Sequence, residues 1–211
     1  MEVHGGASLS TVIEMVSDRR IPAFLLVHGD FGAGKTFLLR KLALHFSQAG
    51  GPLIPVLIEL RSLEKDFNLD QHLSAHFAKE LGEHLRSIPI AAIRYMLREG
   101  HILLLFDGYD ELARNVTFET AANYLRNLTE AAGEKAKVVL TVRTQHFLRD
   151  VQMVSKLVKL PGFRRLRLEP FTDHQILAFL RNKLGNEEAA QTRYDLMDRV
   201  KDLLGLSHNP R

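Results

Sequence analysis

One octapeptide in the sequence has the residue types and spacing of a phosphate-binding loop. Residues 29–36 read Gly-Asp-Phe-Gly-Ala-Gly-Lys-Thr and satisfy the pattern G-x-x-x-x-G-K-[ST] in full. Glycines let the backbone curl so that successive N–H groups point toward phosphate oxygens. Lys35 can reach the β- and γ-phosphates of a nucleotide, and the hydroxyl of Thr36 can ligate Mg²⁺. We therefore expect a nucleotide to contact Gly29, Asp30, Phe31, Gly32, Ala33, Gly34, Lys35, Thr36 and Phe37.

A second group of candidate residues follows the apolar run Ile102–Phe106. This run leads directly into Asp107, and two further acids follow at Asp110 and Glu111. A carboxylate at the end of a buried strand has the rigid support that an Mg²⁺ ligand needs, which makes Asp107 the metal candidate. Either Asp110 or Glu111 could orient and deprotonate an attacking water molecule. An acidic turn after a strand is common in proteins, so this interpretation depends on the phosphate loop.

A cation, Arg143, follows a third apolar run, Val138–Val142. A positive charge at that edge of a sheet could stabilise or sense the γ-phosphate of the same nucleotide. A surface arginine that happens to follow a strand is the alternative that the sequence leaves open.

Apolar runs and helical periodicity alternate along most of the chain. Short apolar runs predict strands at 21–27, 53–60, 102–106, 138–142 and 164–168. Helices are predicted at about 8–20, 36–48, 69–99 (a pair broken near Pro89) and 118–132, with only helices from 172 to 205. This alternation indicates a three-layer α/β fold with a mostly parallel sheet. We predict a P-loop nucleotide-binding domain over 1–170 and a small helical subdomain over 171–211.

The composition is that of an ordinary globular protein, and it excludes several classes of site. The chain has 211 residues, 45% of them hydrophobic, and 28 Lys and Arg against 25 Asp and Glu give a net charge of +3. Because cysteine is absent, disulfides, thiol nucleophiles and cysteine-ligated metals are excluded. Apolar runs fall far short of the roughly 18 residues of a membrane span, and no secretory signal is visible. We therefore expect a cytoplasmic protein without a membrane span.

The acidic segment resembles the Walker B motif of NACHT domains. Asp107-Gly108-Tyr109-Asp110-Glu111 has the family's form, with an Asp after an apolar strand, a small residue, one spacer and two acids. NACHT domains belong to the STAND class of P-loop NTPases, which includes animal innate-immunity sensors and bacterial antiphage defence proteins. Segments 57–63, 139–144 and 168–173 resemble the family's second strand, its sensor strand and the step into its first helical subdomain. The resemblance covers about residues 20–211.

This resemblance implies a sheet order, a set of ligands and a role for each candidate residue. The five strands would lie in the order 5-1-4-3-2, and the ligands would be ATP or ADP with Mg²⁺. The implied roles are phosphate binding by Lys35, Mg²⁺ binding by Thr36 and Asp107, catalysis by Asp110, Glu111 and Arg143, and adenine contact by Pro210.

The same resemblance implies a nucleotide-dependent switch in immune or defence signalling. Exchange of ADP for ATP would favour self-oligomers, and slow Mg-dependent hydrolysis would reset the protein. An N-terminal effector and a C-terminal sensor would lie outside this chain, so we expect the helical subdomain to be truncated.

Three alternatives stay open at this stage. The nucleotide could be GTP, because the family includes members reported with either nucleotide. Hydrolysis could be negligible, which would make the protein a nucleotide-gated scaffold. Residues 143–169 hold seven basic and two acidic residues, so the protein could also be an ATPase that acts on nucleic acid. That segment offers only Phe147 and Phe163 for the base stacking on which single-strand binding depends.

Overall fold

A computed structural model describes residues 9–18, 22–48, 50–51, 53–62, 70–71, 73–74, 77, 89–115, 120, 135, 137–149 and 155–199. Within these ranges, one five-stranded sheet is formed by β1 (Ala23–Gly29), β2 (Ile54–Glu59), β3 (Ile102–Asp107), β4 (Lys137–Arg143) and β5 (Phe163–Arg167). The strands lie in the order β2-β3-β4-β1-β5, and every paired neighbour is parallel. The sheet order expected from the resemblance, 5-1-4-3-2, is confirmed, as is the α/β fold class.

Helices pack around this sheet and extend beyond it. They are α1 (Leu9–Ser17), α2 (Lys35–Gln48), the short 3₁₀ helix η1 (Leu60–Ser62), α4 (Ile90–Arg98), α5 (Tyr109–Asn115), α7 (Thr144–Arg149), α9 (Asp173–Leu184) and α10 (Glu187–Arg199).

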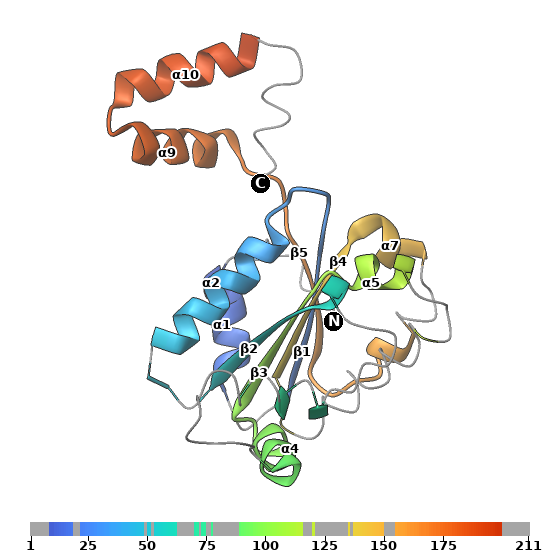
Figure 1. Ribbon diagram of the computed structural model, residues 1–211. Coiled ribbons are helices and arrows are strands. Elements are labelled where there is room, and N and C mark those ends of the chain that lie inside the picture. Colours follow the sequence, from blue (N-terminus) through green and yellow to red (C-terminus); the bar gives the residue numbers. More distant parts are fainter. Residues whose placement is uncertain are drawn as a thin grey trace.

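Different helices cover the two faces of the sheet, and Figure 1 shows α1 and α2 on one side of the strands and α5 and α7 on the other. Side chains alternate along a strand. Leu25 of β1 therefore packs with α1 and α2, whereas Phe24 and Leu26 pack with α4 and α5. Because both faces are covered, β1, β3 and β4 are buried almost throughout. This burial explains their unbroken apolar runs in the sequence.

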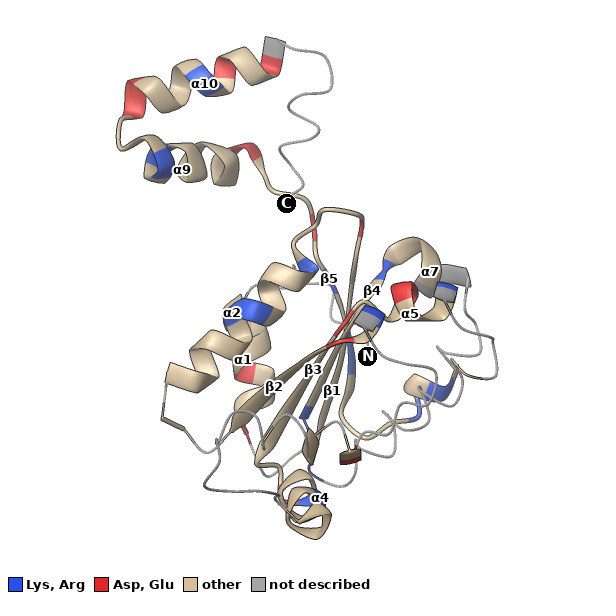
Figure 2. Ribbon diagram, viewed as in Figure 1, with Lys and Arg blue, Asp and Glu red and all other residues tan. Residues whose placement is uncertain are grey.

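Parallel pairing brings the carboxyl ends of the strands to one edge of the sheet. Gly29 of β1 is in register with Arg143 of β4, and Glu59 of β2 is in register with Asp107 of β3. Figure 2 shows charged residues at this edge, around the ends of β2, β3 and β4 and the start of α5. The loop after β1 and the acids after β3 are therefore neighbours, although they are far apart in the sequence.

The acidic segment after β3 begins a short helix that was not predicted from the sequence. Gly108 has a φ of +80°, and α5 begins at the next residue, with Asp110 and Glu111 in its first turn. Tyr109 and Leu112 are buried against the sheet and anchor the helix there. A helix of seven residues is too short for its apolar periodicity to be recognised. The short helix α7, which follows Arg143, was not predicted for the same reason.

Two of the predicted helices lie largely outside the described residues. The helix expected at 118–132 overlaps them only at residue 120, and the first half of the pair expected over 69–99 overlaps them in fragments. The second half of that pair is α4, which begins directly after Pro89 as the sequence predicts.

After β5 the described chain is helical. A capping box begins α9, because the Thr172 hydroxyl accepts the Gln175 N–H at 3.3 Å and the Gln175 side chain accepts the Thr172 N–H at 2.9 Å. Gly185, with a φ of +66°, ends the helix. α9 packs on α10, and the pair stands beyond the carboxyl edge of the sheet (Figure 1). The division at residue 170 into two domains stays a prediction. No helix among the described residues is long and apolar enough to cross a membrane.

Gly162→Ala is expected to destabilise the protein more than Gly185→Ala. Both glycines have a left-handed φ, +67° and +66°, so alanine costs about 1–2 kcal/mol of backbone strain at either position. At Gly162 a Cβ atom would also lie 2.2 Å from the carbonyl oxygen of Pro22, whereas nothing lies within 4 Å at Gly185. That overlap should cost about 1–3 kcal/mol more. Urea unfolding measures both variants, and equal losses would contradict this packing.

Candidate functional site

The phosphate loop joins β1 to α2 and has the curled backbone that its glycines predict. Gly32 and Gly34 have φ values of +77° and +89°, a region that residues with a Cβ atom rarely adopt. At Gly29 a Cβ atom would lie 3.1 Å from the Cβ of Leu168 and 3.2 Å from the Cβ of Ala33. Within the loop, the N–H of Ala33 donates to the carbonyl oxygen of Asp30 at 3.2 Å. The loop therefore needs glycine both for its conformation and for its close packing.

The ammonium group of Lys35 lies within this loop. Its Nζ donates to the carbonyl oxygens of Gly29 at 2.9 Å and Asp30 at 2.8 Å. Burial is the largest effect on this group and lowers its pKa, while the nearby carboxylate of Asp110 opposes the shift. Because burial disfavours the charged ammonium, an anion bound at the loop would be attracted to a cation that has lost part of its hydration.

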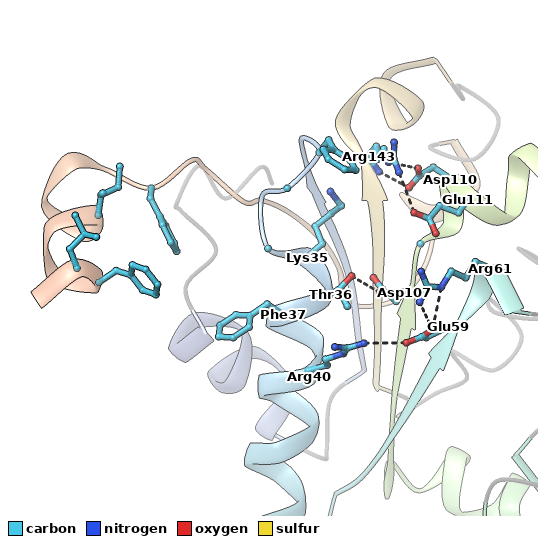
Figure 3. Close-up of a pocket in the computed structure, with 18 of the residues that line it drawn as sticks. Lys35, Thr36, Phe37, Arg40, Glu59, Arg61, Asp107, Asp110, Glu111 and Arg143 are labelled. Carbon is cyan, nitrogen blue, oxygen red and sulfur yellow. Dashed lines mark hydrogen bonds and ion pairs between the residues drawn. The ribbon is translucent and has the colours of Figure 1, made fainter. Parts of the chain in front are cut away.

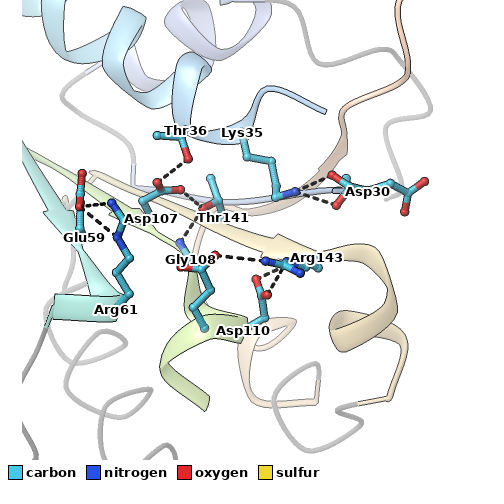
Figure 4. Close-up of polar contacts among 12 residues, drawn as sticks. Asp30, Lys35, Thr36, Glu59, Arg61, Asp107, Gly108, Asp110, Thr141 and Arg143 are labelled. Atoms are coloured by element: carbon cyan, nitrogen blue, oxygen red, sulfur yellow. Dashed lines mark hydrogen bonds and ion pairs between the residues drawn. The ribbon is translucent and has the colours of Figure 1, made fainter. Parts of the chain in front are cut away.

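Asp107 is fixed by hydroxyl groups on both of its oxygens, as Figure 4 shows. The hydroxyl of Thr36 donates to Oδ2 at 2.6 Å, and the hydroxyl of Thr141 donates to Oδ1 at 2.7 Å. Thr141 in turn accepts the N–H of Gly108 at 2.9 Å. The Thr36 hydroxyl and the Asp107 carboxylate are therefore in contact, and both are the hard oxygen ligands that Mg²⁺ prefers. This donor set fits the cation that the sequence predicts here.

Arg143 joins the two other acids to the phosphate loop. Its backbone N–H donates to Oδ1 of Asp110 at 3.0 Å, its Nε lies 2.9 Å from Oδ2 of Asp110, and its Nη2 donates to Oε1 of Glu111 at 3.2 Å. Its guanidinium also lies 5.2 Å from the ring centre of Phe31 in the loop, a cation–π distance. The side chain of Asp110 is 2% exposed and that of Glu111 is 38% exposed. Asp110 is thus held inside, and Glu111 reaches the solvent.

These groups face one cavity of about 800 Å³ (Figure 3). That volume is within the range of about 300–1,000 Å³ typical of small-molecule sites. One wall is polar and comes from the carboxyl edge of the sheet. The opposite wall is apolar and comes from the α9 and α10 segment, through Phe171, Ile176, Phe179, Leu180 and Met197.

The structure brings most of the predicted site residues to this cavity. Its lining includes Phe31, Gly32, Gly34, Lys35, Thr36, Phe37, Asp107, Asp110, Glu111 and Arg143. Gly29 and Asp30 belong to the same loop and bond to Lys35 through their carbonyl groups. Ala33 is buried. Pro210, expected near the adenine, lies outside the described residues.

Several lining or supporting residues were missed by sequence reasoning. Arg40, Glu59 and Arg61 line the cavity, and Thr141 holds Asp107. Glu59 is the last residue of β2, whose neighbour is β3, so the implied strand order was the signal that could have placed it beside Asp107. Thr141 is the one polar residue within the apolar run Val138–Val142, and that was the signal that could have marked it. The apolar wall was missed because it depends on how the helices after β5 meet the loop.

Residues 23–187 match the family model of the NACHT domain. The chain belongs to the NACHT domain family. NACHT domains are P-loop NTPases, and this membership agrees with the phosphate loop, the acidic strand end and the parallel sheet described above.

The NACHT chain is similar in sequence to part of a much longer protein. It is 30% identical over 185 residues to an uncharacterised WD repeat-containing protein of Nostoc sp., an alignment that covers 78% of this chain and 12% of the relative. The chain therefore spans about an eighth of that relative's length.

Solved structures share the fold. Cdc6p from Pyrobaculum aerophilum matches with a TM-score of 0.56 and 17% identity, over 95% of this chain and 57% of the other. AMPPCP-bound DnaA from Aquifex aeolicus matches with a TM-score of 0.56 and 15% identity, over 93% of this chain and 57% of the other. At these identities the likeness concerns the fold alone.

Thr141→Val is expected to destabilise the protein by about 1–3 kcal/mol, because the variant leaves Gly108 N–H and one oxygen of Asp107 without their partner in a buried site. Thr141→Ser keeps the hydroxyl and should lose distinctly less stability. Chemical denaturation of the two variants measures the contrast. A valine variant as stable as the serine variant would show that the hydroxyl does not hold Asp107.

His28 is a buried titratable group directly before the phosphate loop. It is 8% exposed, and its Nδ1 lies 3.4 Å from the hydroxyl of Thr144. Burial, followed by the charges of Arg165 and Arg167, lowers the pKa of His28 from 6.5 to about 4. The folded protein therefore holds this imidazole neutral at pH values where the unfolded chain protonates it.

The free energy of unfolding should consequently fall as the pH is lowered from 6.5 to about 4, because the unfolded state then binds the extra proton. The contribution of His28 to this fall is at most about 3 kcal/mol, at 1.4 kcal/mol per pKa unit. His28→Gln removes this contribution, so the gap between wild type and variant should change across that window. Stability curves that stay parallel from pH 7 to about pH 4 would contradict the shift.

Proposed function

We propose that this NACHT domain binds ATP with Mg²⁺ in the cavity at the carboxyl edge, hydrolyses it slowly, and acts as a switch. One observation carries the proposal. A complete phosphate loop, the Asp107 carboxylate, and Arg143 with its paired acids Asp110 and Glu111 all line one cavity. The loop follows β1, the three acids follow β3 and Arg143 ends β4, and together these groups supply the parts that phosphoryl transfer requires.

The loop and its lysine would bind the phosphates. The N–H groups of the curled loop and the start of α2 favour an anion, and Lys35 would exchange its carbonyl partners for β- and γ-phosphate oxygens. Thr36 and Asp107 would hold Mg²⁺, which when bound would supply a positive charge to the phosphate oxygens. The hydrogen bond from Thr141 would keep the Asp107 carboxylate in position for that contact.

Glu111 is the better candidate for orienting the attacking water, and Asp110 is the better candidate for holding Arg143. Asp110 is buried and engaged by both the backbone and the side chain of Arg143. Glu111 is partly exposed and lines the cavity, so a water molecule can reach it. Arg143 would exchange its contact with Glu111 for the γ-phosphate and would thereby free Glu111 to accept a proton from water.

The apolar wall supports ATP binding and the switch. A nucleobase held against Phe179 and its neighbours would contact α9 while the phosphates contact the sheet, so the ligand would join the two parts. In the STAND class, exchange of ADP for ATP favours self-oligomers and the activation of an effector in immune or defence signalling. We propose the same role for the longer protein, with effector and sensor regions outside this chain. The coverage of only 12% of the Nostoc relative supports such a setting.

Lys35→Ala should weaken ATP binding by about 10- to 100-fold, the range expected for hydrogen bonds to a charged group. Isothermal titration calorimetry with Mg-ATP measures the affinity. Lys135→Ala is the matched control, because Lys135 is paired with Glu99 and does not line the cavity. Unchanged affinity in Lys35→Ala would overturn the site assignment.

Glu111→Gln should lower multiple-turnover ATP hydrolysis by about 10²- to 10⁴-fold, the contribution typical of a general base, with ATP affinity largely retained. Glu99→Gln is the control. Phosphate release measured under saturating ATP tests the prediction. Tight ATP binding with no turnover in the wild-type protein would instead favour the nucleotide-gated scaffold.

A further inference from the structure

A second cationic group lines the cavity, on the side of Asp107 away from Arg143 (Figure 3). Glu59, the last residue of β2, lies beside Asp107 in the sheet register. Its Oε2 accepts hydrogen bonds from Nε of Arg61 at 3.3 Å and from Nη2 of Arg61 at 2.9 Å. Its Oε1 accepts a longer hydrogen bond from Arg40 at 3.5 Å. The two arginines thus share one carboxylate at the edge of the site.

Glu59 orients the guanidinium of Arg61. Both hydrogen bonds go to a single carboxylate oxygen, and they leave further N–H groups of the same planar guanidinium for another acceptor. The hydrogen bonds with Glu59 raise the pKa of Arg61, and the charges of Glu111 and Asp107 raise it further. The side chain of Arg61 is 61% exposed, so a ligand in the cavity can reach it without unfolding any part of the chain.

The charges of the cavity lining bear on how a triphosphate would be bound. The lining acids are Glu59, Asp107, Asp110 and Glu111, and the lining bases are Lys35, Arg40, Arg61 and Arg143. The formal charges of these lining side chains therefore sum to zero before any anion binds. A triphosphate adds several negative charges, and Arg143 is already paired with two carboxylates, those of Asp110 and Glu111. Figure 3 shows Arg61 on the Asp107 side of the cavity, where the proposed Mg²⁺ and the terminal phosphate would be.

We propose that Arg61, oriented by Glu59, contacts the terminal phosphate of ATP and thereby makes the site distinguish ATP from ADP. This inference rests on the proposed function, because it requires a nucleotide in the cavity. Arg61 and Arg143 then bind the terminal phosphate from opposite sides of Asp107. A planar guanidinium suits this role, because it can donate two parallel hydrogen bonds to one phosphate.

The test compares a non-hydrolysable ATP analogue with ADP. Isothermal titration calorimetry with Mg²⁺ and either AMPPCP or ADP gives both affinities for the wild type and for Arg61→Ala. We expect Arg61→Ala to weaken AMPPCP binding by about 10- to 100-fold and to leave ADP binding within about twofold. Retained ADP binding also shows that the variant is folded. An equal loss for both nucleotides, or no loss for either, would overturn the role of Arg61.

Two further variants sharpen the result. Arg61→Lys keeps the charge but loses the planar donor pair, so its AMPPCP affinity should fall between those of the wild type and Arg61→Ala. Arg94→Ala is the matched control, because Arg94 is a similarly exposed arginine that bonds Asp70 and does not line the cavity. Wild-type protein that binds neither nucleotide would overturn the proposed function itself. Wild-type protein that binds both, with an unaltered preference in Arg61→Ala, would overturn only this inference.

Discussion

The hydrogen bonds that hold Asp107 join three separate parts of the chain. Thr36 comes from the start of α2, Asp107 ends β3, and Thr141 belongs to β4, which lies between β3 and β1 in the sheet. The Asp107 carboxylate therefore holds the end of the phosphate loop, at the start of α2, in a fixed position relative to β3 and β4. The contact is possible only because the strands are parallel and end at a common edge, so the sheet order and the chemistry of the site depend on each other.

How far the sequence predicts this site depends on how local each feature is. The phosphate loop is a contiguous motif, and the residues from Gly29 to Thr36 contain the information for both its conformation and its chemistry. Asp107 was predictable because an apolar strand precedes it directly. The role of Thr141 depends on the pairing of β4 with β3, and that of Glu59 depends on the pairing of β2 with β3. Both pairings connect segments distant in sequence, and the strand order came from the family resemblance rather than from spacing.

The short helices show a different limit of sequence reasoning. α5 is stabilised by burial of Tyr109 and Leu112 against the sheet, and such tertiary contacts override the weak helical tendency of a seven-residue segment. The helical conformation of this segment matters for the site. It places Asp110 and Glu111 on successive positions of one rigid turn, so that the first points inward to Arg143 and the second stays partly exposed.

The cations at the carboxyl edge are already engaged within the chain. Lys35 bonds loop carbonyls, Arg143 bonds two acids, and Arg61 shares Glu59 with Arg40. An incoming anion therefore competes with internal partners. The affinity of such a site is the difference between the charge-assisted bonds formed to the ligand and those given up within the chain.

The apolar wall of the cavity belongs to a helical hairpin, and α9 packs chiefly on α10. Its connection to the sheet begins at Leu168, whose N–H still donates to the carbonyl of His28 at 2.8 Å, and α9 starts a few residues later. Among the described residues, the hairpin's main packing is between its own two helices. A ligand that stabilises the hairpin close to the loop would itself be bound more tightly when the hairpin is there, because coupling between sites is reciprocal. A nucleotide that contacts both the loop and this wall, as proposed above, would couple occupancy of the loop to the position of the hairpin.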